Sequence, residues 1–239
     1  NSFCTLLAMH LANLPILDGL TGLPPLLWVL VHCSTRSHEQ RIRKYGLTAR
    51  HADAGDLERI VMHAFVHAHD THLAQNVASY IALAGTLTVP AGLRRIGFTR
   101  ASLGALLFVG GAAMGIWATL ADIDQRNAEF RQRYGLGIGV IESIVGGVHS
   151  AFSRSTFFCG GSAAITAFAG FRAFADGNPV TTIACFSAIL SDIVAIVDPS
   201  AEPWFALLGG TSVAHASHLG GFVFGALVAG ANRLGGARR

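Results

Sequence analysis

Three short stretches of this chain contain residues that could act together on a carbonyl group. HLAQN places His72 and Asn76 one helical turn apart, GGSAAIT contains Ser162, and HASHLGGFVFG contains His218. A serine hydroxyl becomes an effective nucleophile when a base removes its proton, and histidine has a pKa suited to that task near neutral pH. We therefore expect Ser162 to be a nucleophile and His218 to be its general base and later the general acid.

Attack on a carbonyl produces an oxyanion, which needs hydrogen-bond donors aimed at it. Ser162 is expected close to the start of its helix, where backbone N–H groups lack intrahelical partners. His72 and Asn76 are spaced i, i+4, so they share one helix face and would add side-chain donors. The expected oxyanion-stabilising groups are therefore His72, Asn76 and the backbone N–H of Ser162.

The helices that would position these residues belong to a strongly apolar chain. Of its 239 residues, 51% are hydrophobic and 13% are charged, which is typical of a membrane protein. A membrane span needs about 20 mostly apolar residues. The six segments that satisfy this length are residues 3–33, 64–89, 101–121, 157–175, 180–197 and 205–231. We predict an all-α, multi-pass integral membrane protein, a six-transmembrane-helix bundle that forms a single domain over residues 1–239.

A long insertion, residues 122–155, separates the third and fourth predicted spans. Its second part, residues 136–152, is amphipathic and glycine-rich, and we interpret it as an interfacial or re-entrant segment. If this segment crossed the bilayer, every later helix would reverse. Several arginines fall on one side of the predicted bundle, which the positive-inside rule makes cytoplasmic, so the insertion is expected to be non-cytoplasmic. These are Arg94, Arg95, Arg100, Arg172, Arg233, Arg238 and Arg239.

The three polar stretches lie in the second, fourth and sixth predicted spans, which run in the same direction. Each stretch is in the first part of its span, so all three should lie at a similar depth near the non-cytoplasmic surface. Polar residues at such positions are costly and are by default functional. Gly221 and Gly225 fall on the face of His218, where small residues let another helix approach closely. We expect the alanine-rich fourth span to be that partner and to bring Ser162 to His218.

The remaining polar residues have lesser roles or none. His63 and His67 do not share the face of His72 and are interpreted as loop or supporting residues, and Asp192, an acid in the fifth span without an obvious partner, is given no role. The absence of HExxH and of a GxGD aspartate pair argues against metallo- and aspartyl intramembrane proteases. No cofactor is expected. A metal site remains an alternative in one histidine cluster: His63, His67, His69, Asp70 and His72.

Considered together, HAFVHAHDTHLAQN, GGSAAITAF and SHLGGFVFG resemble the motifs of the rhomboid family of intramembrane serine proteases. The resemblance implies a serine endopeptidase that cleaves transmembrane proteins near the outer membrane face. It implies a dyad of Ser162 and His218 without a third acid, metal or cofactor, and a substrate helix that enters beside spans two and five. The supporting residues that it implies are Gly160, Gly161, Gly221, Gly225, His63 and His67.

The chain departs from the rhomboid pattern at several places. Ala163 replaces the glycine after the nucleophile, and Thr166 stands where an aromatic residue often stacks on the histidine. Glu58 and Arg59 replace a Trp-Arg pair of the first loop, and the insertion at residues 122–155 is unusually long. None of these departures removes a catalytic group, but they bear on substrate preference, loop packing and turnover.

Two other classes of function are compatible with the sequence. The first is a catalytically inactive rhomboid-like protein that binds membrane clients, against which the complete serine, histidine and asparagine set argues. The second is a small transporter or channel that uses its histidines as a proton relay; proton-dependent flux that survives Ser162→Ala would favour it. The partners expected of the protease are transmembrane protein substrates and membrane lipid. A net charge of +3 without basic–aromatic runs argues against nucleic acid.

Overall fold

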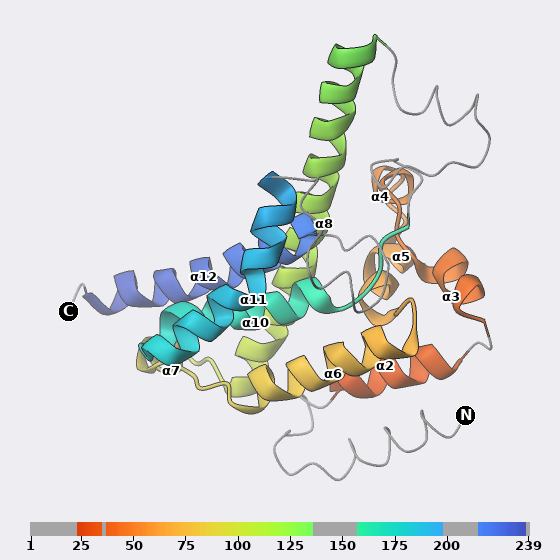
Figure 1. Ribbon diagram of the computed structural model, residues 1–239. Coiled ribbons are helices and arrows are strands. Elements are labelled where there is room, and N and C mark those ends of the chain that lie inside the picture. The colour runs from red at the N-terminus through yellow and green to blue at the C-terminus, as the bar shows by residue number, and fades with distance from the viewer. Residues whose placement is uncertain (1–22, 35–36, 136–156, 198–214, 238–239) are drawn as a thin grey trace.

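The computed structural model describes residues 23–34, 37–135, 157–197 and 215–237 (Figure 1). This part of the chain is all-helical, which confirms the predicted all-α class; its one β-type pairing is an isolated bridge between Leu47 and Phe158. The elements are α2 (Leu23–Cys33), α3 (His38–Tyr45), α4 (Ala49–Asp53), α5 (Leu57–Met62), the 3-10 turn η1 (His63–Phe65), α6 (Asp70–Gly85), α7 (Ala91–Arg95), α8 (Arg100–Tyr134), α10 (Ser162–Ala175), α11 (Pro179–Val197) and α12 (His215–Ala237).

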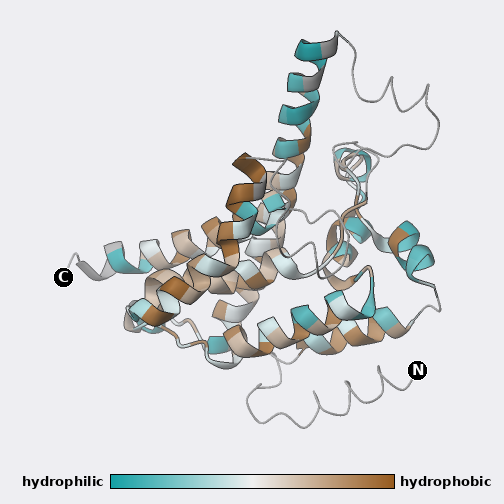
Figure 2. Cartoon of the chain, viewed as in Figure 1, coloured by the Kyte–Doolittle hydropathy of each residue, from teal (hydrophilic) through white to brown (hydrophobic). Residues whose placement is uncertain are grey.

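One described helix, α8, is long and apolar enough to cross a membrane, over Arg100–Arg133. Three others, Leu23–Cys33, Ser162–Ala175 and Pro179–Val194, are apolar but shorter. Figure 2 shows that the apolar residues of α8 occupy its lower part, whereas its upper end is hydrophilic. Among the described residues, therefore, fewer helices are long and apolar enough to cross a membrane than the six spans predicted from hydropathy.

The helix α8 is longer than predicted, because it continues through the first part of the expected insertion. Its continuation is stabilised by pairs at i, i+4, in which Arg126 Nε lies 2.8 Å from Asp122 Oδ1 and Gln125 donates to Glu129 at 2.8 Å. The helix ends at Gly135, whose φ of 72° is the left-handed conformation that closes many helices. The segment 136–152, interpreted as interfacial or re-entrant, lies outside the described residues.

The starts of the other predicted spans also differ from the structure. The predicted span 157–175 becomes helical only at Ser162, because the residues before it are extended and pair with Leu47. The predicted span 64–89 becomes helical at Asp70, after the side chain of His69 accepts a hydrogen bond from the N–H of His72 and caps the helix. The predicted span 180–197 is nearly correct, since α11 begins at Pro179, the first helical position that proline favours. Residues 3–22 and 205–214 of the first and last predicted spans lie outside the described residues.

Small residues bring α8, α10 and α12 together. A Cβ atom at Gly111 of α8 would lie 2.5 Å from Ala167 Cβ of α10. On α12, a Cβ atom at Gly221 would lie 2.0 Å from the Ala163 carbonyl oxygen, and one at Gly225 would lie 1.9 Å from the Ala167 carbonyl oxygen. The backbones of α10 and α12 are therefore in direct contact, and α10 is the partner expected for the glycine face of α12.

Trp28 of α2 anchors a second part of the core. Its side chain is fully buried, and its ring lies 5.4 Å from Tyr80 of α6 and 6.0 Å from Phe108 of α8. The indole N–H donates to the Ala64 carbonyl at 2.9 Å, which satisfies its buried polar atom. Figure 1 shows α2 and α6 side by side along the lower side of the described helices.

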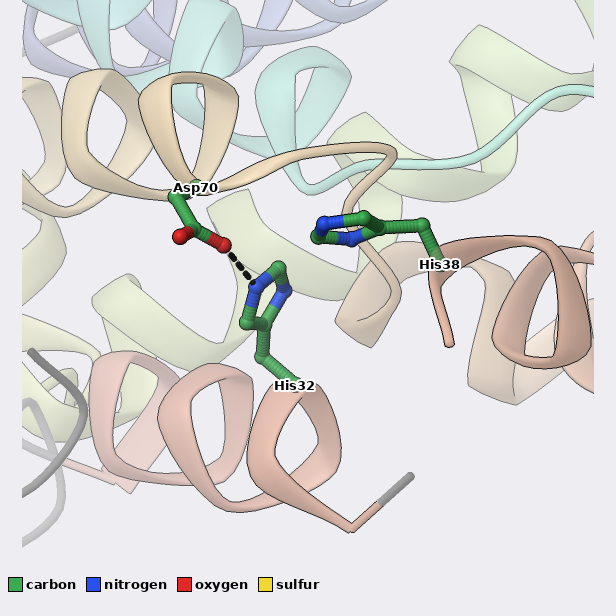
Figure 3. A group of neighbouring side chains, drawn as sticks. All are labelled: His32, His38 and Asp70. Carbon is green, nitrogen blue, oxygen red and sulfur yellow. Dashed lines mark hydrogen bonds and ion pairs between the residues drawn. The ribbon is translucent and has the colours of Figure 1, made fainter. Parts of the chain in front are cut away.

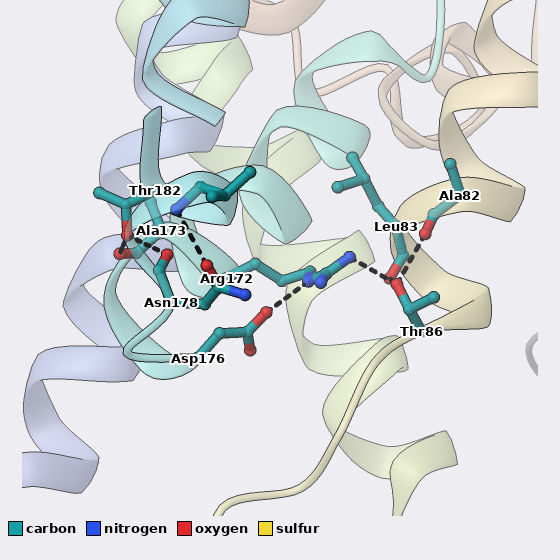
Figure 4. Close-up of polar contacts among 9 residues, drawn as sticks. Ala82, Leu83, Thr86, Arg172, Ala173, Asp176, Asn178 and Thr182 are labelled. Carbon is teal, nitrogen blue, oxygen red and sulfur yellow. Dashed lines mark hydrogen bonds and ion pairs between the residues drawn. The ribbon is translucent and has the colours of Figure 1, made fainter. Parts of the chain in front are cut away.

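The helix α11 packs on α10 and α12 along one face. Thr182, Cys185, Ile189 and Asp192 recur at helical spacing, and the last three are at most 5% exposed. Thr182 donates to the Ala173 carbonyl of α10 at 2.9 Å. At the same end of α10, Arg172 forms an ion pair with Asp176 and donates to the hydroxyl of Thr86, the residue that follows α6 (Figure 4). The hydrogen bond from Thr182 links α11 to α10, and the buried face of α11 continues to Asp192.

Candidate active site

Ser162 and His218 lie within hydrogen-bonding distance in the structure. Ser162 is the first residue of α10, and His218 lies in the first turn of α12. The distance between Ser162 Oγ and His218 Nε2 is 2.8 Å, so the hydroxyl can donate directly to the imidazole. Both groups are part-buried, with 17% of the His218 side chain exposed. This is the geometry that transfer of the serine proton to a base requires.

Backbone N–H groups surround the serine because α10 begins at this residue. The residue before it, Gly161, provides no side-chain cap, and the first helical hydrogen bond runs from the Ile165 N–H to the Gly161 carbonyl at 3.0 Å. The N–H groups of the first turn therefore have no partner within the helix. They carry the positive end of the helix dipole, which favours a negative charge at this position.

The extended segment before α10 is held in place by the loop that contains α3 to η1. Leu47 and Phe158 exchange two backbone hydrogen bonds, of 2.8 and 3.1 Å, and the Gly160 N–H donates to the His63 carbonyl at 2.8 Å. A Cβ atom at Gly161 would lie 2.4 Å from the ring of Trp28. The glycines before the serine thus pack directly against the first part of the chain.

Gly160 brings the HLAQN stretch to the serine. Its φ of +116° is a backbone conformation that residues other than glycine rarely adopt. A Cβ atom there would lie 2.8 Å from the His72 ring and 3.7 Å from Asn76 Nδ2. The absence of a side chain therefore lets the imidazole and the amide approach the backbone two residues before Ser162.

The amide of Asn76 is held by two imidazoles. As oriented in the structure, Asn76 Nδ2 donates to His67 Nε2 at 2.8 Å and to His72 Nε2 at 3.3 Å. His67 is fully buried and its ring packs edge-on against Trp28 at 5.5 Å. The bond to His72 is long, so it is the one that a substrate oxygen could replace. His67 thus fixes the orientation of the Asn76 amide.

His63 also supports the site from the loop. Its backbone carbonyl holds Gly160, and its ring Nδ1 lies 2.8 Å from the Ile60 carbonyl. Burial lowers the pKa of His63 to about 4, because the charged imidazolium would lose its hydration. The ring is therefore neutral at physiological pH, and its Nδ1 carries the proton that it donates to Ile60.

Asp192 and His215 lie beside His218, and the sequence interpretation gave neither residue a role. Each carboxylate oxygen of Asp192, on α11, lies 3.1 Å from His218 Nδ1. Its Oδ1 also lies 2.6 Å from His215 Nδ1. The signal that could have indicated Asp192 is its type: a lone acid on the buried face of an apolar helix requires a partner. That partner could not be identified from spacing, because it lies 26 residues away on another helix.

The group of possible metal ligands differs from the histidine cluster considered in the sequence. Among the described residues, it consists of His32, His38 and Asp70 (Figure 3). His32 Nε2 lies 2.7 Å from Asp70 Oδ1, which ties the end of α2 to the start of α6. The guanidinium of Arg41 contacts both imidazoles, at 3.3 Å from His32 Nε2 and at His38 Nδ1. A cation already competes for these nitrogens, so we assign the cluster a structural role.

The chain was compared with known proteins in three ways. No family model matches it, and neither a curated protein nor a solved structure matches it. The functional assignment therefore depends on the residues and geometry described above.

Proposed function

We propose that this chain is a rhomboid-type intramembrane serine endopeptidase that cleaves transmembrane proteins near the outer membrane face. The observation that carries the proposal is the 2.8 Å contact between Ser162 Oγ and His218 Nε2 at an uncapped helix start. The proximity of His72 and Asn76 to Gly160 supports it further. Four of the residues expected from three distant stretches thus lie in one place.

The proposed reaction begins when the Ser162 hydroxyl gives its proton to His218 Nε2 as Oγ attacks the peptide carbonyl. The negative charge that develops on the carbonyl oxygen is stabilised by the Ser162 backbone N–H, Asn76 and His72. The imidazolium then protonates the leaving amine, and an acyl-enzyme remains. Water, deprotonated by His218, releases the second product and restores the serine.

A lipid environment is supported by the distribution of exposed side chains. On three helices, large apolar residues are 58% to 79% exposed, an arrangement that is costly in water and favourable in lipid. They are Val109 and Trp117 of α8, Val180, Ile183, Leu190 and Val197 of α11, and Leu227 of α12. Together with the hydropathy of the sequence, this pattern supports a lipid environment for these three helices, within the six-span protein that we propose.

The proposal is tested by labelling the detergent-purified protein with a fluorophosphonate probe, which reacts with activated serines. The parent should be labelled, whereas Ser162→Ala and His218→Ala should not. Cleavage of a transmembrane reporter protein in vesicles should depend on the same two residues. A folded parent that is not labelled would overturn the proposal in favour of a client-binding protein, and cleavage retained by Ser162→Ala would overturn the assignment of the nucleophile.

A further inference from the structure

The carboxylate of Asp192 faces the nitrogen of His218 that is opposite Ser162. Both carboxylate oxygens lie 3.1 Å from His218 Nδ1, while Nε2 of the same ring lies 2.8 Å from Ser162 Oγ. Asp192 is 4% exposed, so few water molecules reach the carboxylate to compete for it. The three side chains form a continuous chain of hydrogen bonds across α10, α12 and α11.

The packing of α11 explains why Asp192 reaches this position. Cys185 and Ile189 precede it on the same buried face, and they form a cluster with Phe222 of α12. The ring of Phe186 also packs against Phe222, with 5.2 Å between the centroids. Asp192 follows Ile189 by three residues, so it is the next side chain of this face and meets α12 one turn before Phe222.

The protonation of His218 follows from the chemistry of the carboxylate. An ionised carboxylate accepts hydrogen bonds and donates none, so His218 Nδ1 carries a proton when it faces Asp192. In the neutral imidazole, Nε2 is then unprotonated and can accept the serine proton. The opposite tautomer would point an N–H at Ser162 and could not act as a base.

We propose that Asp192 is a positioning residue that completes a Ser162–His218–Asp192 triad. The inference rests on the proposed function, and it differs from the dyad that the rhomboid resemblance implies. Asp192 holds His218 in the productive tautomer and orientation, and it stabilises the imidazolium that forms when Ser162 loses its proton. The carboxylate remains ionised throughout, so no proton passes to it.

His215 shares the carboxylate with His218. Its Nδ1 lies 2.6 Å from Asp192 Oδ1, and its side chain is 23% exposed. A buried charge needs several hydrogen bonds, and two imidazole donors supply them here. His215 lies one turn before His218 on α12 and contacts the carboxylate from the outer side. Among the described residues, His72 of α6 also interacts electrostatically with His218.

The test measures the rate of fluorophosphonate labelling as a function of pH in the parent, Asp192→Asn, Asp192→Glu and Asp176→Asn. Asp192→Asn should slow labelling on the order of 10²–10⁴-fold and shift the midpoint of the pH profile downward, because the imidazolium loses its counter-charge. Asp192→Glu should recover at least a tenth of the parental rate. Asp176→Asn is the matched control, since it removes a carboxylate from an ion pair at the far end of α10. It should label within about twofold of the parent, as surface and peripheral pairs contribute little.

Proton NMR provides a second measurement, in which Asp192 keeps its native side chain. A hydrogen-bonded imidazole N–H resonance far downfield should be present and should disappear in His218→Ala. Absence of this resonance from a labelled parent would overturn the triad, as would parental labelling with an unchanged pH profile in Asp192→Asn. Equal slowing in Asp192→Asn and Asp176→Asn would also overturn it, since the effect would then be general. If Ser162→Ala were still labelled at the parental rate, the proposed function itself would instead be overturned.

Discussion

The hydroxyl of Thr166 lies 2.9 Å from the backbone carbonyl of His218, and so it links α10 to the residue that Ser162 contacts. The same hydroxyl lies 2.9 Å from the Ala163 carbonyl of its own helix. Thr166 follows Ser162 by about one turn, so the link is formed beside the site. In the rhomboid pattern an aromatic residue often occupies this position. Here its place is taken by a threonine whose hydroxyl lies within hydrogen-bonding distance of two backbone carbonyls, one on each helix.

Replacing Thr166 by valine should slow labelling of Ser162 and lower the melting temperature. Valine keeps the shape of threonine and removes the hydroxyl, so the loss is that of one hydrogen bond, about 0.5–1.5 kcal/mol, or roughly two- to tenfold in rate if the bond acts on the reactive geometry. Fluorophosphonate labelling rates and thermal unfolding of the parent and Thr166→Val in detergent would measure the two losses. Thr166→Ser keeps the hydroxyl and is the matched control. Equal rates and melting temperatures in valine and serine variants would show that the link does not contribute.

The glycines of α12 permit the direct contact of backbones on which the site depends. Gly221→Ala and Gly225→Ala should each separate α12 from α10, because the new methyl group would lie 2.0 or 1.9 Å from a carbonyl oxygen. Overpacking of this kind costs about 1–3 kcal/mol and should abolish most labelling, since Ser162 and His218 lie on the two separated helices. Thermal unfolding measures the loss of stability, and the labelling rate measures the loss of the reactive geometry.

Gly230→Ala is the control for this prediction on the same helix. A Cβ atom at Gly230 meets nothing within 4 Å, and alanine favours the helix by about 0.5–1 kcal/mol over glycine. The variant should therefore be labelled at the parental rate and be as stable as the parent or slightly more stable. If Gly221→Ala behaved like Gly230→Ala, the close approach of α12 to α10 would be wrong.

Gly160→Ala should reduce labelling more than its backbone strain alone explains. Alanine at a φ of +116° is strained, and its methyl group would also press on the His72 ring at 2.8 Å. Gly177→Ala separates the two effects, because Gly177 also has a positive φ, of 65°, but a Cβ atom there meets nothing within 4 Å. Gly177→Ala should lose about 1–2 kcal/mol of stability from the left-handed conformation, and Gly160→Ala should lose more, because its φ of +116° lies outside the αL region. Only Gly160→Ala should lose labelling by tenfold or more, and equal labelling of the two variants would contradict the contact with His72.

The sequence was sufficient to predict the proximity of candidate residues that belong to the same short motif. His72 and Asn76 lie one turn apart on a helix, and Gly221 follows His218 by one turn, so helical geometry alone relates each pair. The meeting of Ser162 and His218 required a further step, the count of spans that makes their helices parallel. The contact is present, although the described helix lengths do not establish that count.

The parts that could not be predicted depend on contacts between distant helices. Nothing in the sequence around Asp192 indicates that its face of α11 ends against His218 and His215, because the register of one helix against another is set by packing. The sequence placed Ser162 near the start of its helix but began the span too early, at residue 157, since the residues before Ser162 include apolar side chains that a helix would accommodate. They are extended because Phe158 pairs with Leu47, more than 100 residues earlier in the chain.

The stability of the fold should fall as the pH is lowered from about 6.5 toward 4, and His63 should account for part of this loss. Its pKa is about 4 in the folded protein, where burial disfavours the imidazolium, and 6.5 in an exposed chain. Between these values the unfolded state binds more protons than the folded state, so acid favours unfolding. Above pH 6.5 both states are neutral and the contribution of His63 is complete. The full difference corresponds to about 3 kcal/mol.

His63→Asn tests this assignment, because the asparagine amide can donate to the Ile60 carbonyl in place of ring Nδ1 and does not titrate. Melting temperatures of the parent and the variant should be compared at pH 7 and pH 4.5 in the same detergent. The parent should lose more stability between the two pH values than the variant, while the backbone bond from Gly160 to residue 63 is kept in both. The variant retains some dependence on pH, because His67 is buried as well. An identical loss in both proteins would mean that His63 is protonated in the folded state, and its place as a neutral support beneath Gly160 would then be wrong.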